Sequence, residues 1–289
     1  MKLARFVEGS RVVAGLIDND RFDAYDSLGP DPFGDYIEQN KPDEIGLSEF
    51  ITMIIDGQES ISYNLSWIEH RLIMPMVPSE VWAAGVTYKR SVEAREDETD
   101  IKGIYDMVYE SERPEILLKG FGYRTVGPND IICIRSDSKW NVPEPEFTLV
   151  YGEKKVVGYI IGNDVSSRDI EGANPLYLPQ AKVFRNSCAI GPYLVTADEI
   201  RDPRNVSISL IIHRSGDVVF SGETSTANMK RGFNELTEHL FRDNPVPRGA
   251  IMLTGVGVVP PDDFTLQDGD LVEITMVGLG KMRNHVRQL

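Results

Sequence analysis

Two glutamates one residue apart, Glu144 and Glu146, constrain this chain more than any other feature. Pro145 separates them, and an apolar run from Phe147 to Tyr151 follows directly, so the two acids stand at the start of a predicted β-strand. Side chains at positions i and i+2 of a strand share one face, so both carboxylates point the same way. Two like charges this close repel each other, which indicates that the fold supplies a counter-charge.

A third acid, Asp164, is predicted to join this pair. A second apolar run at residues 156–162 follows a turn at residues 152–155 and leads to Asp164. In a β-hairpin the second strand returns past the start of the first, which brings Asp164 beside Glu144 and Glu146. Three carboxylates with only oxygen ligands are typical of a site for a hard cation, Mg²⁺, Mn²⁺ or Ca²⁺. The alternative is a solvated strand end whose acids contact only water.

The composition excludes several classes of partner. The chain has 289 residues and a formal net charge of −15, which argues against nucleic acid and against an anionic membrane surface. We find no apolar run of transmembrane length and no apolar core of a signal peptide near the N-terminus, so we expect a cytoplasmic protein. The two cysteines, Cys133 and Cys188, lie in apolar runs and are expected to be buried hydrophobic residues.

The N-terminal quarter contains no cluster of catalytic residue types. Its pattern predicts strands at residues 3–7, 11–17 and 21–25, and apolar residues at helical spacing predict a helix within residues 46–57. Prolines at positions 75 and 78 mark a boundary, so we divide the chain into a small N-terminal domain, 1–76, and a catalytic domain, 77–289.

Several short motifs together carry a resemblance to the fumarylacetoacetate hydrolase superfamily over roughly residues 77–289. They include Asn163-Asp164-Val165-Ser166-Ser167-Arg168-Asp169, Gln180-Ala181-Lys182, Gly191-Pro192 and Thr254-Gly255. Within that superfamily, further segments resemble the branch of 2-keto-3-deoxy-D-arabinonate dehydratases. These are Arg113-Pro114-Glu115-Ile116, Arg135-Ser136-Asp137-Ser138, Asn174-Pro175-Leu176-Tyr177 and Arg242-Asp243-Asn244-Pro245.

The resemblance implies an α+β, β-rich fold, in which a mixed β-roll or barrel-like core carries a few outer helices. Strands also outnumber helices in our assignment of residues 116–289, which argues against a doubly wound sheet. The predicted elements include a strand at 81–88, a hairpin within 206–223, a helix at 229–241, a strand at 271–277 and a closing turn at 280–286. The resemblance also implies a homodimer, with a higher homo-oligomer as the alternative.

The same resemblance assigns roles to individual residues. Glu144, Glu146 and Asp164 would bind Mg²⁺, with Mn²⁺ and Ca²⁺ as alternatives. Lys182 would be catalytic and would also contact the carboxylate or ketone oxygen of a 2-keto acid. Gly85, Tyr88, Lys119, Thr254 and Gly255 would complete the substrate site, with neutralisation of the acid Glu115 as the alternative role of Lys119.

The general base is less well defined by the sequence. Hydrolase members of the superfamily carry a His-x-x-Glu pair in a lid that follows the strand at 81–88, and this chain has no histidine there. The absence argues against hydrolysis and fits a dehydratase, which need not activate water. Glu115, which enters an apolar strand, and Glu93, in the lid, are the two candidate bases.

These assignments predict a hydro-lyase that dehydrates 2-keto-3-deoxy-D-arabinonate to 2,5-dioxopentanoate. The cation polarises the C2 ketone, a glutamate removes a C3 proton, and the C4 hydroxyl leaves. One alternative is an acylpyruvate hydrolase or oxaloacetate decarboxylase with the same metal site. An alternative of another class is a non-catalytic protein that binds a keto acid or a metal.

Overall fold

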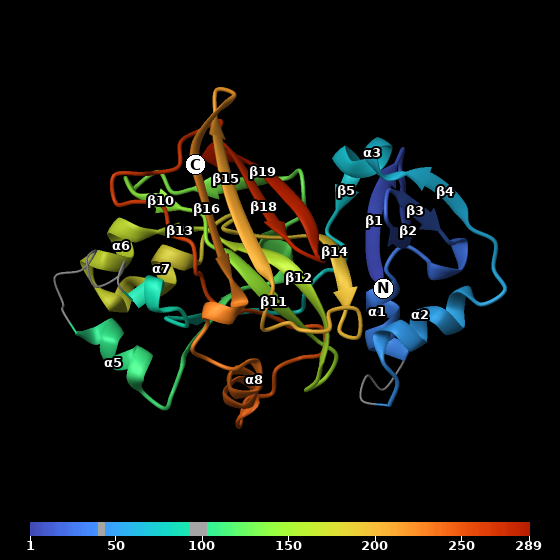
Figure 1. The fold of residues 1–289 in the computed structure, drawn as a ribbon, viewed down its shortest axis with the longest axis horizontal. Coiled ribbons are helices and arrows are strands. Elements are labelled where there is room, and N and C mark those ends of the chain that lie inside the picture. The colour runs from blue at the N-terminus through green and yellow to red at the C-terminus, as the bar shows by residue number, and fades with distance from the viewer. Residues whose placement is uncertain (40–43, 93–102) are drawn as a thin grey trace.

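The computed structural model describes residues 1–39, 44–92 and 103–289 (Figure 1). Within these ranges the chain forms one large mixed sheet, a second sheet packed against it, and short helices around both. The α+β, β-rich class predicted from the sequence is confirmed. Within the same ranges no helix is long and apolar enough to cross a membrane.

The large sheet has twelve strands among the described residues, and most neighbours are antiparallel. Its order is β4 (Ile61–Asn64), β3 (Arg21–Ala24), β2 (Arg11–Asp18), β1 (Lys2–Glu8), β14 (Cys188–Thr196), β12 (Val156–Asp164), β11 (Pro145–Tyr151), β17 (Ile251–Leu253), β6 (Val81–Gly85) and β7 (Glu115–Gly120). Two short strands extend it, because β5 (Leu72–Ile73) pairs with β1 and β8 (Thr125–Val126) pairs with β14. The sheet thus runs without a break from the N-terminal strands to the hairpin that carries the acids.

The second sheet has five strands in the described part of the chain. Its order is β16 (Asp217–Ser225), β15 (Ser207–Arg214), β18 (Leu271–Met276), β19 (Gly280–Gln288) and β9 (Ile131–Ile134), and a separate pair is formed by β10 (Asn141–Val142) and β13 (Ser166–Ser167). The main hydrophobic core lies between the two large sheets: Leu149 and Ile161 of the first pack in one cluster with Ile208 and Ile274 of the second. Burial of these side chains is the main force that holds the sheets together.

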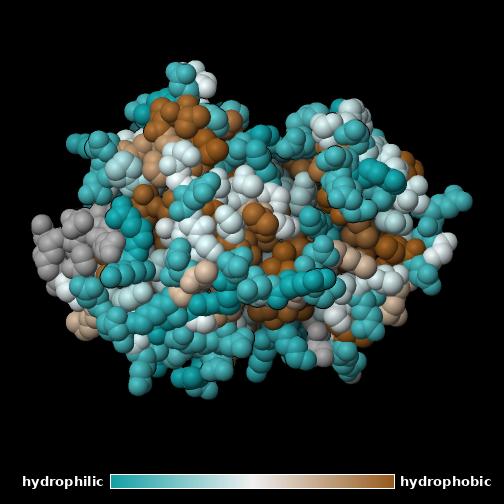
Figure 2. Space-filling view, in the orientation of Figure 1, coloured by the Kyte–Doolittle hydropathy of each residue, from teal (hydrophilic) through white to brown (hydrophobic). Residues whose placement is uncertain are grey.

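The helices are short and lie at the edges of the sheets (Figure 1). They are α1 (Pro32–Gln39), α2 (Leu47–Ile55), α3 (Leu65–Ile68), α5 (Ile104–Glu110), α6 (Arg168–Ala173), α7 (Leu178–Lys182) and α8 (Phe233–Phe241). Figure 1 places α1, α2 and α3 beside the N-terminal strands and α5, α6 and α7 at the opposite end of the molecule. On the face drawn in Figure 2, hydrophobic side chains form separate patches between larger hydrophilic areas.

Most strands and helices expected from the sequence are present, with three differences. The strand predicted at 81–88 ends at Gly85, because Val86 has a positive φ of 55° that leaves the extended conformation. The helix predicted at 229–241 begins only at Phe233. The segment 280–286, predicted as a closing turn, belongs to strand β19, which pairs with β18 and β9.

Candidate metal centre and active site

The three predicted acids meet at one end of the β11–β12 hairpin. Glu144 immediately precedes β11, Glu146 lies within it, and Asp164 is the last residue of β12. The backbone N–H of Asp164 donates to the carbonyl of Glu144 at 2.9 Å, which closes the hairpin at this point. One carboxylate oxygen from each acid lies within 4.8 Å of the others, and all three residues are buried. The sequence prediction that Asp164 returns to the two glutamates is therefore correct in its geometry.

Three buried cations surround the acids. Lys182, the last residue of α7, places its Nζ 2.6 Å from Glu144 Oε2 and 3.2 Å from Asp164 Oδ2. Arg168, the first residue of α6, forms an ion pair with Glu144 Oε1 at 2.8 Å. Lys119 of β7 forms an ion pair with Asp164 Oδ1 at 2.5 Å. Buried charges of one sign are costly unless they are paired with the opposite charge. Here the elements β7, α6 and α7 each supply one basic side chain.

The carboxyl group of Glu146 is strongly perturbed by its surroundings. Burial raises the pKa of the Glu146 carboxyl well above its usual range, and the negative charges of Asp164 and Glu144 raise it further. The ammonium of Lys182 and a hydrogen bond from the backbone N–H of Gly255 to Glu146 Oε2 act in the opposite direction. A bound cation would stabilise the charged form of this carboxyl group and so offset the effect of burial.

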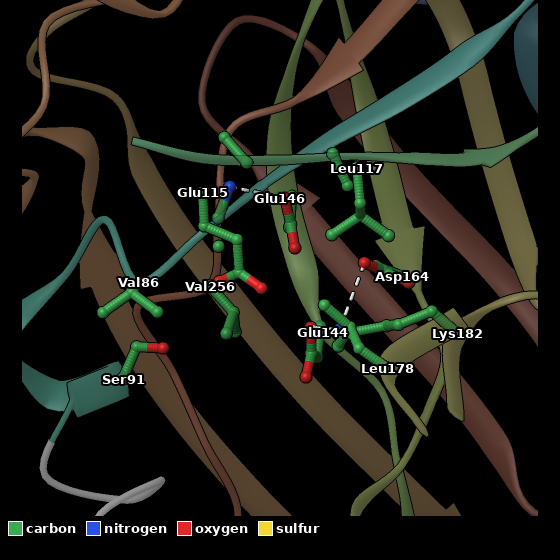
Figure 3. Close-up of a pocket in the computed structure, with 14 residues that line it drawn as sticks. Val86, Ser91, Glu115, Leu117, Glu144, Glu146, Asp164, Leu178, Lys182 and Val256 are labelled. Atoms are coloured by element: carbon green, nitrogen blue, oxygen red, sulfur yellow. Dashed lines mark hydrogen bonds and ion pairs between the residues drawn. The ribbon is translucent and has the colours of Figure 1, made fainter. Parts of the chain in front are cut away.

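Glu115 reaches the same pocket from the edge of the sheet. It opens β7 and pairs with Gly85 across the β6–β7 ladder. In Figure 3 its carboxylate points, with Glu146 and Asp164, toward the middle of the pocket. The pocket is also lined by smaller or apolar side chains: Ala83, Ala84, Val86, Ser91, Leu117, Leu178 and Val256. Glu93, the other candidate base, lies outside the described residues.

Three of the predicted substrate-binding residues, Lys119, Tyr88 and Thr254, do not line the pocket. The Lys119 side chain is fully buried, and its Nζ donates to the carbonyl oxygens of Val165, at 3.0 Å, and of Lys182. The Lys119 ammonium is thus engaged by protein atoms, namely these two carbonyls and the Asp164 carboxylate. Tyr88 is also buried, its hydroxyl has no hydrogen-bond partner among the described residues, and burial followed by the charge of Glu146 raises its pKa.

The Thr254-Gly255 pair lies beside the acids and contributes through its backbone. The hydroxyl of Thr254 donates to the carbonyl of Phe147 at 2.6 Å, which fastens this segment to β11. Gly255 lines the pocket and has a φ of +102°, and a Cβ at this position would overlap the hydroxyl of Thr87. Glycine is required here because this backbone conformation brings the N–H of Gly255 onto Glu146.

Two residues of this centre were not proposed from the sequence. Arg168 lies in the segment that carried the family resemblance, but we did not assign it to the site. The hydroxyl of Ser166 accepts a hydrogen bond from Lys182 Nζ at 2.6 Å. Two features of the sequence could have identified Arg168. The neighbouring acids need a counter-charge, and an arginine stands four residues after Asp164.

The donor set fits a hard divalent cation. All three candidate ligands are carboxylates, the class that Mg²⁺ and Ca²⁺ prefer, and together they carry enough negative charge to compensate such an ion. The raised pKa of Glu146 indicates that the protein alone does not fully compensate these charges. A solvated strand end, the alternative interpretation, is wrong because the three acids are buried.

Comparison with known proteins places this arrangement in a known class. The family model described as fumarylacetoacetate (FAA) hydrolase C-terminal matches residues 145–287. A 2-dehydro-3-deoxy-D-arabinonate dehydratase of Saccharolobus solfataricus is 38% identical over 100% of this chain and 97% of its own. The chain therefore belongs to the fumarylacetoacetate hydrolase family.

Two further relatives within that family are also named as dehydratases of 2-keto-3-deoxy sugar acids. A probable 2-keto-3-deoxyxylonate dehydratase of Haloferax volcanii is 46% identical over 76% of each chain. A solved structure of 2-keto-3-deoxy-D-arabinonate dehydratase complexed with magnesium and 2,5-dioxopentanoate is 35% identical. It superposes with a TM-score of 0.80 over 100% of this chain and 99% of the other.

Proposed function

We propose that this protein is a hydro-lyase that dehydrates 2-keto-3-deoxy-D-arabinonate to 2,5-dioxopentanoate with the help of Mg²⁺. The observation that carries the proposal is the buried triad of carboxylates with Glu115 and Lys182 on the same small pocket. The proposal is also supported by the similarity, over the full length of the chain, to a 2-dehydro-3-deoxy-D-arabinonate dehydratase. A cluster of buried charged side chains is costly to fold, so we infer that it is retained for chemistry.

The residues of the pocket have different proposed roles, which follow from their positions. Glu144, Glu146 and Asp164 would hold the cation. When bound, Mg²⁺ supplies a Lewis acid that polarises the C2 ketone and makes the C3 hydrogens acidic. The ammonium of Lys182, buried between Glu144 and Asp164, stabilises negative charge that develops on the substrate oxygens beside it.

Glu115 is the residue that we propose as general base. Its carboxylate is only partly buried, lines the pocket and comes from a different strand than the triad. It takes the C3 proton, the C4 hydroxyl leaves as water after receiving a proton, and a C3=C4 double bond forms. Transfer of a proton from C5 to C3 moves the double bond to C4=C5 and gives an enol. Transfer of the enol O–H proton to C4 then yields the C5 aldehyde of 2,5-dioxopentanoate. Glu93 stays the alternative base.

The other reactions considered from the sequence are less well supported. The chain has four histidines, His70, His213, His239 and His285, and none lines the pocket formed by the described residues. An acylpyruvate hydrolase would need a group of this kind to activate water. Neither oxaloacetate decarboxylation nor non-catalytic binding of a keto acid is named as the function of the two dehydratase relatives described above.

A proton NMR time course with 2-keto-3-deoxy-D-arabinonate tests the proposal. We expect an aldehyde signal to appear with Mg²⁺ and to be absent after EDTA treatment. E146Q should be inactive, and E153Q, which alters an exposed acid paired with Arg248, should match the wild type. Full activity of E146Q without metal, or an unchanged substrate spectrum with Mg²⁺, would refute the proposal.

Two further expectations concern the protein as a whole. We propose a homodimer or a higher homo-oligomer, to be tested by light scattering coupled to size-exclusion chromatography. A monomer at micromolar concentration would refute it. We also propose a cytoplasmic location, to be tested by fractionation of cells that produce the protein from its own gene.

A further inference from the structure

Each of the three carboxylates proposed to bind the metal has one oxygen that already contacts a protein donor. For Asp164 this is Oδ1, paired with Lys119 at 2.5 Å, and for Glu144 it is Oε1, paired with Arg168 at 2.8 Å. For Glu146 it is Oε2, which accepts the backbone N–H of Gly255. The same arrangement thus occurs three times, with donors from three different segments of the chain.

The two charged donors cannot easily turn away from these oxygens. The side chains of Lys119 and Arg168 both have 0% relative exposure. Lys119 is fixed further by the carbonyls of Val165 and Lys182. The backbone N–H of Arg168 donates to the carbonyl of Trp140 at 2.7 Å, which fixes the start of α6. Rotation of either carboxylate would break a buried ion pair, which is strongly unfavourable.

The second oxygens of Glu144 and Asp164 face the pocket. Glu144 Oε2 and Asp164 Oδ2 are the atoms that contact Lys182 Nζ, at 2.6 Å and 3.2 Å. Lys182 itself lines the pocket, as Figure 3 shows. Each of these two acids therefore offers a cation one oxygen, while its other oxygen is engaged behind the site.

This restriction matters for the choice of cation. Ca²⁺ takes about six to eight oxygens at about 2.3–2.6 Å and commonly gains two of them from one carboxylate. Mg²⁺ takes six ligands at about 2.0–2.1 Å in near-octahedral geometry and keeps several waters. A site that offers one oxygen per acid disfavours the larger ion and suits the smaller one. Lys119 and Arg168 are thus placed to affect cation choice without touching the cation.

We propose that Lys119 and Arg168 are positioning residues that select Mg²⁺ or Mn²⁺ over Ca²⁺ by limiting Asp164 and Glu144 to one inward oxygen each. The proposal rests on the metal site of the proposed function. It also gives Lys119 a role that differs from the substrate contact expected from the sequence. The proposed role is to restrict the rotation of two carboxylates, so its effect on metal binding can be measured separately from the effect of the positive charges.

The ratio of two dissociation constants isolates this geometric effect. Removal of a positive charge near the site strengthens the binding of every divalent cation to a similar degree. The ratio Kd(Ca²⁺)/Kd(Mg²⁺) cancels that contribution. Loss of a restraint on carboxylate rotation, in contrast, favours only the ion that can use a second oxygen. A change in the ratio is therefore the signature of positioning.

The test is isothermal titration calorimetry of wild type, K119M and R168M with MgCl₂ and with CaCl₂, without substrate. We expect the ratio to fall by about tenfold or more in both variants, in the range typical of outer-shell changes at metal sites. R214M is the matched control, because Arg214 pairs with the buried Asp270, which does not line this pocket, at 2.8 Å. Its ratio should equal that of the wild type.

An unchanged ratio in folded K119M and R168M would overturn the proposal. If neither variant folds, infrared difference spectra of the wild type decide, because carboxylate stretching bands distinguish binding through one oxygen from binding through two. One-oxygen bands with both Mg²⁺ and Ca²⁺ would support the proposal, and two-oxygen bands with Ca²⁺ would overturn it. Failure of the wild type to bind any divalent cation would instead remove the metal site and the proposed function together.

Discussion

Gly85 and Glu115 face each other across the β6–β7 ladder, and the Glu115 carboxylate occupies the space that a Cβ at Gly85 would need. The atom that would be displaced is the far end of a flexible side chain, so a larger residue at 85 moves the carboxylate rather than the backbone. The position of the proposed base thus depends on the absence of a side chain on the neighbouring strand.

The variant G85A should fold and bind Mg²⁺ but turn over slowly. Displacement of a catalytic group by about 1 Å can cost about 100-fold in rate, so we expect a loss of that order in kcat. G120A, on the neighbouring strand β7, is the control, because a Cβ there meets no atom within 4 Å. Steady-state kinetics with calorimetric Mg²⁺ titration checks the prediction, and wild-type kcat in G85A would contradict it.

Replacement of Glu115 distinguishes the two candidate bases. General base catalysis contributes about 100-fold to 10,000-fold, so E115Q should lose this factor in kcat while its Mg²⁺ affinity stays near that of the wild type. E93Q should retain most of its activity. The reverse pattern in the same kinetic assay would assign proton removal to Glu93.

Lys182→Met should change turnover and metal affinity in opposite directions. The ammonium contacts Glu144 Oε2 and Asp164 Oδ2, the oxygens that face the pocket, so it competes with a cation for them. Its loss should tighten Mg²⁺ binding and lower kcat by about 100-fold or more, the cost typical of removing one preorganised electrostatic contact. Weaker Mg²⁺ binding by folded K182M would show that the lysine supports the cation instead.

The metal-free protein should lose stability as the pH rises above the pKa of a normal carboxyl group. The pKa of Glu146 is raised above the ordinary value of 4.5 in the folded state, so the folded protein binds more protons than the unfolded chain in this window. The stabilisation is complete below pH 4.5 and is lost as the pH rises through the folded-state pKa. Denaturant unfolding in EDTA measures the slope, and E146Q, which does not titrate, should flatten it.

The division of the chain at residue 76 can be tested by truncation. Leu3 of β1 pairs with Leu194 of β14, and Phe33 and Phe50 share a hydrophobic cluster with Ile160 and Leu194. A fragment of residues 77–289 would expose this cluster and the edge of β14, so we expect it to aggregate. Cooperative thermal unfolding of a monodisperse fragment would establish 77–289 as an autonomous domain.

The sequence by itself determined the local elements and the identity of the acids. Period-two patterns and turn residues predicted β1, β2, β11 and β12, because a strand's side-chain alternation is a local property. The i, i+2 spacing placed Glu144 and Glu146 on one face, and the hairpin turn brought Asp164 back to them. These inferences need only short stretches of chain.

The tertiary structure decided which groups surround those acids and how they are engaged. Arg168 and Lys119 are single basic residues in the sequence, and only the packing of α6 and β7 against the hairpin turns them toward Glu144 and Asp164. The continuity of the N-terminal strands with β14 is equally non-local, because strand pairing joins residues almost 200 positions apart. Contacts of this range depend on the whole fold, so local sequence patterns predict the carboxylates but not their partners.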